Sequence, residues 1–164
     1  MNIYNELIKS ISSPGPSLIG LIDPDEKNKD FLDVQLNYIN ENQYCAVFVG
    51  GSLFMDSKFD KIIDILRSKT KLPLISFPSS SSHIHKKFDA ILFLSLISGR
   101  NPQYLIGEHI NSAPIIHSLG LESIPVGYIL LDGGGRSSVE VMSNTRSLPM
   151  EKVDIIMLDN MPKS

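Results

Sequence analysis

Short apolar runs alternate with amphipathic segments along most of the chain. Each run is about five residues long and rich in aliphatic side chains, which is typical of a strand buried on both faces of a sheet. The segments between the runs repeat apolar residues at helical spacing, as Phe59, Ile63 and Leu66 do among charged neighbours. The predicted strands are residues 18–22, 44–49, 72–77, 90–94 and 127–131.

The intervening segments predict helices that join these strands into a parallel sheet. Strands that alternate with helices form right-handed βαβ units. Asn101 is suited to be the N-cap of the last helix and Pro102 its first residue, while Pro114 is expected to kink it. The predicted helices are residues 1–9, 29–40, 59–69 and 102–119.

The fold class is therefore α/β, but the length leaves two architectures open. A closed (β/α)₈ barrel takes about 250 residues, and this chain has 164. An open doubly wound sheet is one reading. The other is an incomplete (β/α)₈ TIM barrel, comprising about the first five βα units.

Composition narrows the function classes. The chain is 42% hydrophobic and 20% charged with a net charge of −3, so no basic field points to a nucleic-acid partner. The lone Cys45 excludes an internal disulfide and fits a reducing compartment. No apolar run reaches the roughly 18 residues of a membrane span. We expect one cytoplasmic domain over residues 1–164 with a divergent tail at 151–164.

The ends of the first two strands carry the chemistry. Asp23 follows an apolar strand, and Pro24 then stops strand pairing because it has no N–H. The second strand ends in Gly50, Gly51 and Ser52. Neighbouring parallel strands lie about 4.8 Å apart, so a carboxylate and a hydroxyl could share a Mg²⁺ ion while the glycines expose N–H groups to a phosphate. The alternative is two plain turns.

Two further groups of residues give weaker evidence for a functional site. The glycine run 133–135 with Arg136 could cradle a phosphate, but it matches no known phosphate loop, and a flexible loop is the favoured interpretation. Ser95, Asp132 and a histidine could form a nucleophilic triad. The sequence lacks the Gly-x-Ser-x-Gly elbow of such enzymes, which argues against it.

The four histidines are expected to have no catalytic role. His83 and His85 lie in a polar loop without a third metal ligand nearby, so we expect both to be solvated. His109 and His117 are expected on the outer side of the 102–119 helix.

Several motifs resemble geranylgeranylglyceryl phosphate synthases, in the same order along the chain. The most specific is Phe93 to Gly107, which reads FLSLISGRNPQYLIG. The others are residues 21–25, 49–52, 73–78, 120–122, 124–128, 132–134 and 138–145.

The resemblance implies a TIM-barrel prenyltransferase of ether-lipid synthesis. It would join the 3-hydroxyl of sn-glycerol 1-phosphate to C1 of geranylgeranyl diphosphate, or of a related polyprenyl diphosphate, and release diphosphate. The family's Mg²⁺ would be held by Asp23 and Ser52, with Gly50 and Gly51 on the diphosphate side. An apolar groove would hold the prenyl tail.

The sequence also departs from the family pattern. Glu26 stands where the family usually has lysine, and Ser79 replaces a glycine. The chain ends before the family's glycerol phosphate segments and its catalytic glutamate, so we expect a C-terminal truncation and no catalytic residue in this chain. The alternative function is an inactive remnant that at most binds Mg²⁺-diphosphate. Open sheet edges would favour a homo-oligomer.

Overall fold

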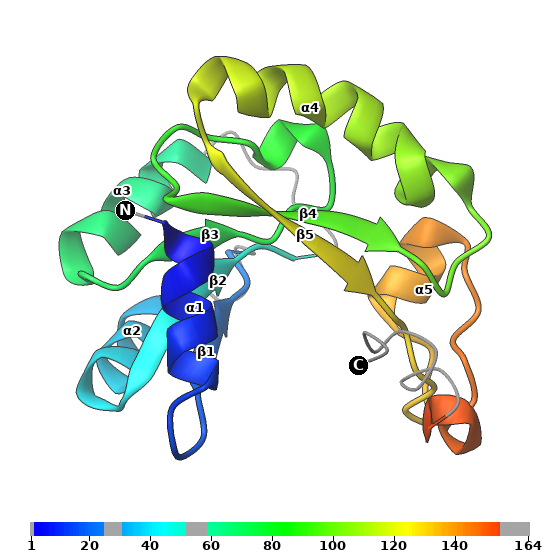
Figure 1. The fold of residues 1–164 in the computed structure, drawn as a ribbon, viewed down its shortest axis with the longest axis horizontal. Helices are drawn as coiled ribbons and strands as arrows, with labels where there is room; N and C mark the ends of the chain where they lie inside the picture. Colours follow the sequence, from blue (N-terminus) through cyan, green and yellow to red (C-terminus); the bar gives the residue numbers. More distant parts are fainter. Residues whose placement is uncertain (1, 25–30, 52–58, 155–164) are drawn as a thin grey trace.

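The computed structural model describes residues 2–24, 31–51 and 59–154, and within them five parallel strands form one curved sheet (Figure 1). The strands lie in sequence order, each hydrogen-bonded to the next. Consecutive units of a (β/α)₈ barrel have this strand order. In a doubly wound sheet, by contrast, the strand order reverses at a switch point. The incomplete-barrel prediction is confirmed. The strands are β1 (Leu18–Ile22), β2 (Tyr44–Val49), β3 (Leu74–Ser76), β4 (Ala90–Leu96) and β5 (Glu122–Tyr128).

Helices cover both faces of the sheet. The chain order of the described α-helices is α1 (Ile3–Ile11), α2 (Leu32–Glu41), α3 (Phe59–Lys69), α4 (Glu108–Leu119) and α5 (Ser138–Ser143). Three short helical segments complete the fold: 3₁₀ turns at Ser81–His83 (η2) and Met150–Lys152 (η4), and a π-helix at Gln103–Gly107 (η3). In the described ranges, every helix is too short or too polar to cross a membrane.

Two apolar clusters hold these layers together. On the outer face, side chains of α2 and α3 pack on alternate residues of the first three strands, with Leu36, Ile63 and Val47 fully buried. On the inner face, α1 packs Ile3 and Leu7 against the other set of strand residues. The predicted amphipathic N-terminal helix is thus confirmed, and it closes the inner face of the sheet.

The N-terminus of α1 is fixed by a strand residue far along the chain. Both carboxylate oxygens of Glu122 accept hydrogen bonds, from the backbone N–H groups of Ile3 and Tyr4, at 2.8 Å each. A carboxylate at a helix N-terminus also compensates the helix dipole. This contact ties the first helix to the start of β5.

Two elements differ from the prediction. The fifth strand begins at Glu122 rather than at 127, and Pro125 lies inside it opposite Phe93. Proline is tolerated there because β5 is an edge strand of the described sheet. The helix after β4 has the predicted span, 102–119, but its first part is a π-helix. Asn101 Oδ1 accepts the Gln103 N–H there at 3.1 Å, and α4 then continues through Pro114.

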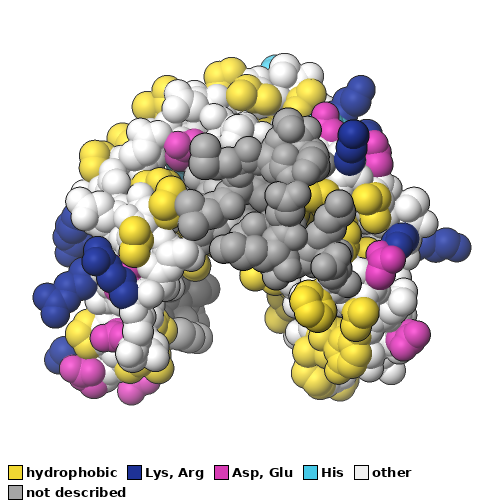
Figure 2. Space-filling view, turned by 180° about the vertical axis from the view of Figure 1, so that it is seen from behind, with side chains coloured by type: hydrophobic (Ala, Val, Ile, Leu, Met, Phe, Trp, Pro, Cys, Tyr) yellow, Lys and Arg dark blue, Asp and Glu magenta, His cyan; other side chains and the backbone are white. Residues whose placement is uncertain are grey.

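The space-filling view from behind shows an arch whose upper rim is formed by α4 (Figure 2). Hydrophobic side chains lie along this rim, although it faces solvent.

Candidate functional site

The carboxyl ends of the first three strands lie side by side. The Gly50 N–H donates to the Ile22 carbonyl at 3.0 Å, and the Phe77 N–H donates to the Val49 carbonyl at 2.9 Å. These bonds extend the sheet by one residue beyond β2 and β3. Residues that follow the three strands therefore share one edge of the sheet, as the sequence predicted.

Asp23 and Gly51 are in direct contact at this edge. A Cβ atom placed on Gly51 would lie 2.6 Å from the carboxyl carbon of Asp23, closer than real Cβ contacts allow. A Cβ on Gly50 would lie 2.7 Å from the carbonyl carbon of Phe77. A side chain at Gly50 would clash with the backbone of Phe77, whereas one at Gly51 would force the Asp23 carboxylate to move. The Asp23 carboxylate thus lies over bare backbone.

The second predicted metal ligand, Ser52, lies outside the described residues, as does Asp25. Gly51, the last described residue before Ser52, contacts the Asp23 carboxylate. Within 2–24, 31–51 and 59–154, no three His, Cys, Asp or Glu side chains cluster as a metal site. An ion bound here would take few ligands from the described residues.

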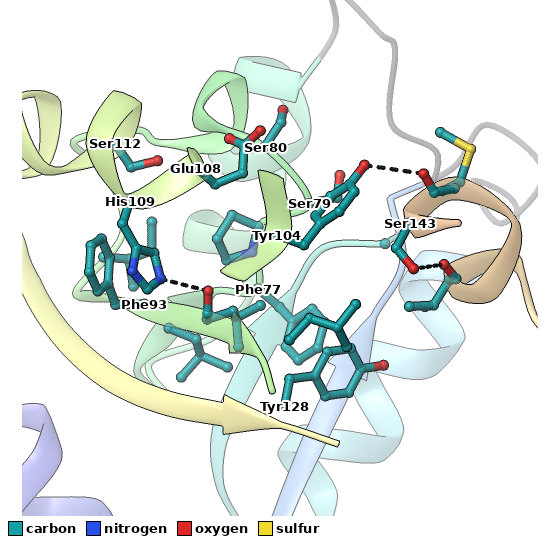
Figure 3. Close-up of a pocket in the computed structure, with 18 of the residues that line it drawn as sticks. Phe77, Ser79, Ser80, Phe93, Tyr104, Glu108, His109, Ser112, Tyr128 and Ser143 are labelled. Carbon is teal, nitrogen blue, oxygen red and sulfur yellow. Dashed lines mark hydrogen bonds between the residues drawn. The ribbon is translucent and has the colours of Figure 1, made fainter. Parts of the chain in front are cut away.

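An apolar cavity of about 270 Å³ lies between the loop after β3, strand β4 and helix α4 (Figure 3), and Gly51 is one of its lining residues. This volume is close to the lower end of the range for ligand pockets. Burial raises the pKa of the Tyr128 phenol above 10.0, so its hydroxyl remains protonated at neutral pH. The apolar lining comprises Phe77, Pro78, Ile91, Leu92, Phe93, Leu94, Leu96, Ile116, Val139 and Met142; the more polar lining comprises Ser79, Ser80, Tyr104, Glu108, His109, Ser112, Tyr128 and Ser143.

His109 lines this cavity, so its predicted place on the outer side of the helix is wrong. Its ring stacks on Phe93 with centroids 4.0 Å apart, and its Nε2 lies 2.8 Å from the Leu94 carbonyl oxygen (Figure 3). Because a carbonyl can only accept, Nε2 carries the proton. It therefore cannot act as a base for Ser95, whose Oγ is 3.4 Å away. The triad that the sequence disfavoured is not formed.

Two contacts close the cavity around η3. The Glu108 carboxylate accepts from the Ser81 N–H at 3.1 Å and from the Gln103 side-chain amide at 2.7 Å. The Tyr104 hydroxyl donates to the Met142 carbonyl at 3.4 Å (Figure 3). The first contact joins the loop after β3 to the π-helix, and the second joins the π-helix to α5.

The loop histidines also differ from the prediction. His83 is buried, with its Nδ1 3.3 Å from the Ser79 N–H nitrogen and its ring 5.5 Å from that of Phe59. His85 is mostly covered, and its Nε2 lies 3.3 Å from Asp60. The expectation that both would be solvated is wrong, because the serine loop folds back over α3. His117 is exposed, as predicted.

The glycine run 133–135 lies on the open surface after β5. The Gly134 N–H donates to Asp132 Oδ1 at 2.9 Å, and Arg136 borders a shallow polar depression there. Next to it, Glu140 accepts from Ser137 and Ser147, and these hydrogen bonds lower the pKa of its carboxyl to about 2. Asp132 lines this depression, whereas Asp23 contacts Gly51, a lining residue of the apolar cavity.

The cavity residues on η3 and α4 were missed by sequence reasoning, although a signal existed. His109, Ser112 and Ile116 are spaced three to seven residues apart, which places them on one helix face. That face carries the buried Ile116, so His109 belongs to the covered side. His117 lies one residue further on and is turned outward.

The sequence matches a known protein family over most of its length. The PcrB family model matches residues 15–163, which include most of the segment after Lys152. The geranylgeranylglyceryl phosphate synthase of Chitinophaga pinensis is 39% identical over 156 residues, covering 94% of this chain and 62% of that protein. The synthase of Zunongwangia profunda is 40% identical over 157 residues, covering 94% of this chain and 65% of that protein.

Solved structures agree in fold. That of (S)-3-O-geranylgeranylglyceryl phosphate synthase from Thermoplasma acidophilum, in complex with its substrate sn-glycerol-1-phosphate, has a TM-score of 0.81 and 29% identity, covering 95% of this chain and 63% of that chain. Wild-type GGGPS from Thermoplasma volcanium has a TM-score of 0.83 at 23% identity and likewise shares the fold.

These matches have the same extent. The chain spans 62% to 65% of the length of these two curated relatives. A family match over residues 15–163, with these relatives and this fold, shows that the chain belongs to the PcrB family.

Proposed function

We propose that the protein is a magnesium-dependent prenyltransferase. It joins the 3-hydroxyl of sn-glycerol 1-phosphate to C1 of geranylgeranyl diphosphate or a related polyprenyl diphosphate. The described residues supply the half of the site that binds the prenyl donor. The names of the relatives, and the glycerol phosphate in the Thermoplasma acidophilum structure, support this substrate pair.

One observation carries the proposal: Gly51 contacts the Asp23 carboxylate and also lines the apolar cavity. A prenyl diphosphate likewise has a charged part and an apolar part, which are its diphosphate head and its long hydrocarbon tail. With the head at the strand ends, the tail enters between Phe77 and the β4 side chains. Apolar walls favour the tail because burying hydrocarbon is worth about 0.8 kcal/mol per CH₂.

The residues at the strand ends fit a magnesium ion. Asp23 offers carboxylate oxygens beside the backbone of Gly51, and Ser52 is the next residue after Gly51 in the sequence. These two residues would hold the ion. When bound, the metal would neutralise the diphosphate and make it a better leaving group. Few protein ligands suffice, since Mg²⁺ usually keeps several waters and is completed by phosphate oxygens.

The chain's own residues then bind and orient the donor. In the transfer, the bond from C1 to the diphosphate oxygen breaks and its electrons leave with diphosphate. The 3-hydroxyl oxygen forms the new bond to C1, and its proton passes to the released diphosphate. The cavity side chains hold the tail so that C1 remains beside Gly51, and the apolar walls keep water from competing with the acceptor hydroxyl.

Donor binding is the first test. Isothermal titration of the protein with geranylgeranyl diphosphate, in Mg²⁺ and then in EDTA, should show affinity that depends on the metal. Asp23→Asn should abolish the dependence on Mg²⁺. Asp132→Asn is the matched control. Asp132 is also an aspartate that follows a strand, β5, but its exposed carboxylate accepts a hydrogen bond from the Gly134 N–H. Metal dependence that survives Asp23→Asn would refute the donor site.

Turnover is the second test. The protein is incubated with labelled sn-glycerol 1-phosphate, geranylgeranyl diphosphate and Mg²⁺, and label is followed into the organic phase. We expect an ether product that is lost with Asp23→Asn. Metal-dependent donor binding without product would overturn the transferase and leave the second candidate, a Mg²⁺-diphosphate binding protein without activity.

A further inference from the structure

A short loop after β3 forms part of the cavity wall. This serine loop, residues 79–82, follows Phe77 and Pro78, and the backbone of Phe77 lies against Gly50 at the strand ends. Ser79 and Ser80 line the cavity together with Gly51 (Figure 3). The position of the loop therefore helps to set the shape of the cavity that we assign to the prenyl donor.

Side-chain hydrogen bonds hold this loop on two sides. The Ser79 N–H donates to Nδ1 of His83 at 3.3 Å, and the Ser76 hydroxyl donates to the His83 carbonyl at 3.1 Å. On the other side, the Ser81 N–H donates to the Glu108 carboxylate at 3.1 Å. His83 is 4% exposed. One buried histidine thus contributes two of these three contacts.

The contact with the Ser79 N–H requires one protonation state of His83. Because Nδ1 accepts this hydrogen bond, the ring is neutral and carries its hydrogen on Nε2. A proton on Nδ1 would point at the Ser79 N–H and leave that donor without its acceptor. The protonated ring would instead donate to the Ser79 hydroxyl, whose oxygen is also 3.3 Å from Nδ1. Protonation would therefore exchange one contact of residue 79 for another.

We propose that His83 is a positioning residue for the prenyl donor, and that protonation of its ring weakens donor binding. This role rests on the proposed function, which assigns the cavity to the donor's tail. The neutral ring holds Ser79 in the cavity wall, whereas the protonated ring releases the Ser79 N–H and shifts the wall. Donor affinity is highest where His83 is neutral, and it falls as the pH decreases through the titration of this histidine.

Other titratable groups of the described residues around His83 have partners of their own. Asp60, at the start of α3, lies 3.3 Å from Nε2 of His85. On α4, Glu108 and His109 have the partners given above. The remaining charged side chains of α3 and of the segment that joins β3 to β4 form ion pairs with other residues or are exposed: Lys61, Asp64, Arg67, Lys69, Lys86, Lys87 and Asp89. Among these groups, His83 and Glu108 are the two that bond the serine loop.

Titration with geranylgeranyl diphosphate in Mg²⁺, at about pH 7.5 and about pH 5.5, tests the proposal. His83→Asn is the central variant, because its Oδ1 takes the position of Nδ1, accepts the Ser79 N–H and does not titrate. Both proteins should bind equally well at the higher pH. At the lower pH wild type should bind about 10-fold more weakly than His83→Asn, since a histidine one pH unit below an ordinary pKa of about 6.5 is about nine-tenths protonated. The titration of the diphosphate and of every other residue is common to both proteins and cancels.

His83→Leu separates positioning from packing. Leucine fills the buried site but cannot accept the Ser79 N–H, so donor affinity at about pH 7.5 should fall about 10-fold, and His83→Asn should restore it. Thermal melting shows whether each variant is folded, and the comparison of wild type with His83→Asn does not depend on the leucine variant. Wild-type affinity in folded His83→Leu, or the same pH dependence in His83→Asn and wild type, would overturn the proposal.

His85→Asn is the matched control. His85 is a mostly covered histidine of the same segment, its Nδ1 accepts the Lys87 N–H at 3.2 Å, and it does not line the cavity. This variant should keep both the affinity of wild type and its pH dependence. Loss of the pH dependence in His85→Asn would assign the effect to the wrong histidine and overturn the proposal.

Amide hydrogen exchange gives a measurement that needs no donor. Protection of the Ser79 N–H, corrected for the intrinsic exchange rate at each pH, should fall in wild type between about pH 7.5 and about pH 5.5 and stay constant in His83→Asn. Equal protection in the two proteins at both pH values would overturn the contact. Failure of wild type to bind geranylgeranyl diphosphate at either pH would refute the proposed function and the effect on donor affinity with it, whereas the Ser79 protection would still show whether His83 holds the loop.

Discussion

Gly51→Ala is the most informative substitution at the strand ends. The new Cβ would lie 2.6 Å from the Asp23 carboxyl carbon, which falls short of ordinary contact at 3.4 Å by 0.8 Å. The carboxylate must therefore move by nearly 1 Å. A displacement of this size in a binding or catalytic group can cost about 100-fold, which corresponds to about 2.7 kcal/mol. We expect magnesium-dependent affinity for geranylgeranyl diphosphate to fall by about this factor.

The fold should be affected much less. The clash is with the end of a side chain that can rotate, and Gly51 does not have a left-handed backbone conformation. Gly133→Ala is the control, because a Cβ there meets no atom within 4 Å. It should change neither binding nor melting temperature.

A double-mutant cycle sharpens this prediction. If Gly51→Ala acts by displacing the carboxylate, it should add little to Asp23→Ala, since groups in contact are not additive. Titration calorimetry supplies the affinities, and thermal melting shows that each variant is folded. Wild-type affinity in Gly51→Ala, or full additivity with Asp23→Ala, would refute the reasoning.

Three further predictions concern the core, the cap of α5 and the cavity. Ile63→Ala removes a fully buried side chain and should cost about 2–5 kcal/mol in urea unfolding, whereas Ile65→Ala, at 39% exposure, should cost less than about 1 kcal/mol. The pKa of Glu140 is lowered to about 2 from an ordinary 4.5, so its stabilising effect is present above pH 4.5 and is lost as the pH falls toward 2. Glu140→Gln should therefore reduce the loss of stability at acid pH when the free energy of unfolding is measured from pH 2 to 7. An unchanged loss of stability would contradict the role of Glu140 in capping α5. Tyr104→Ala opens the cavity wall beside Met142 and should improve binding of longer polyprenyl diphosphates relative to geranylgeranyl diphosphate; unchanged relative affinity would contradict a tail in this cavity.

Much of the fold follows from local sequence signals. Apolar runs that end in Pro24 or in Gly50 predict strands and their ends, and α3 has the predicted bounds because charges alternate with its apolar face. The start of β5 was misplaced because Pro125 argues against a strand interior. At an edge strand that objection does not hold.

The contact between Asp23 and Gly51 could also be predicted, since parallel neighbours end at the same edge. The cavity could not, because its walls come from the loop after β3 and from β4, η3, α4, β5 and α5, and no local pattern reports how distant segments meet. The burial of His83 has the same origin. Its covering comes from Ser79 and from Phe59, on a helix that precedes β3.

The central claim is that Asp23 and the cavity together bind a prenyl diphosphate through magnesium. Titration of wild type and Asp23→Asn with geranylgeranyl diphosphate, with and without Mg²⁺, tests it most directly. We expect tight binding by wild type that is lost both on removal of Mg²⁺ and on substitution of Asp23. Equal binding by the two proteins, or binding indifferent to Mg²⁺, would contradict it.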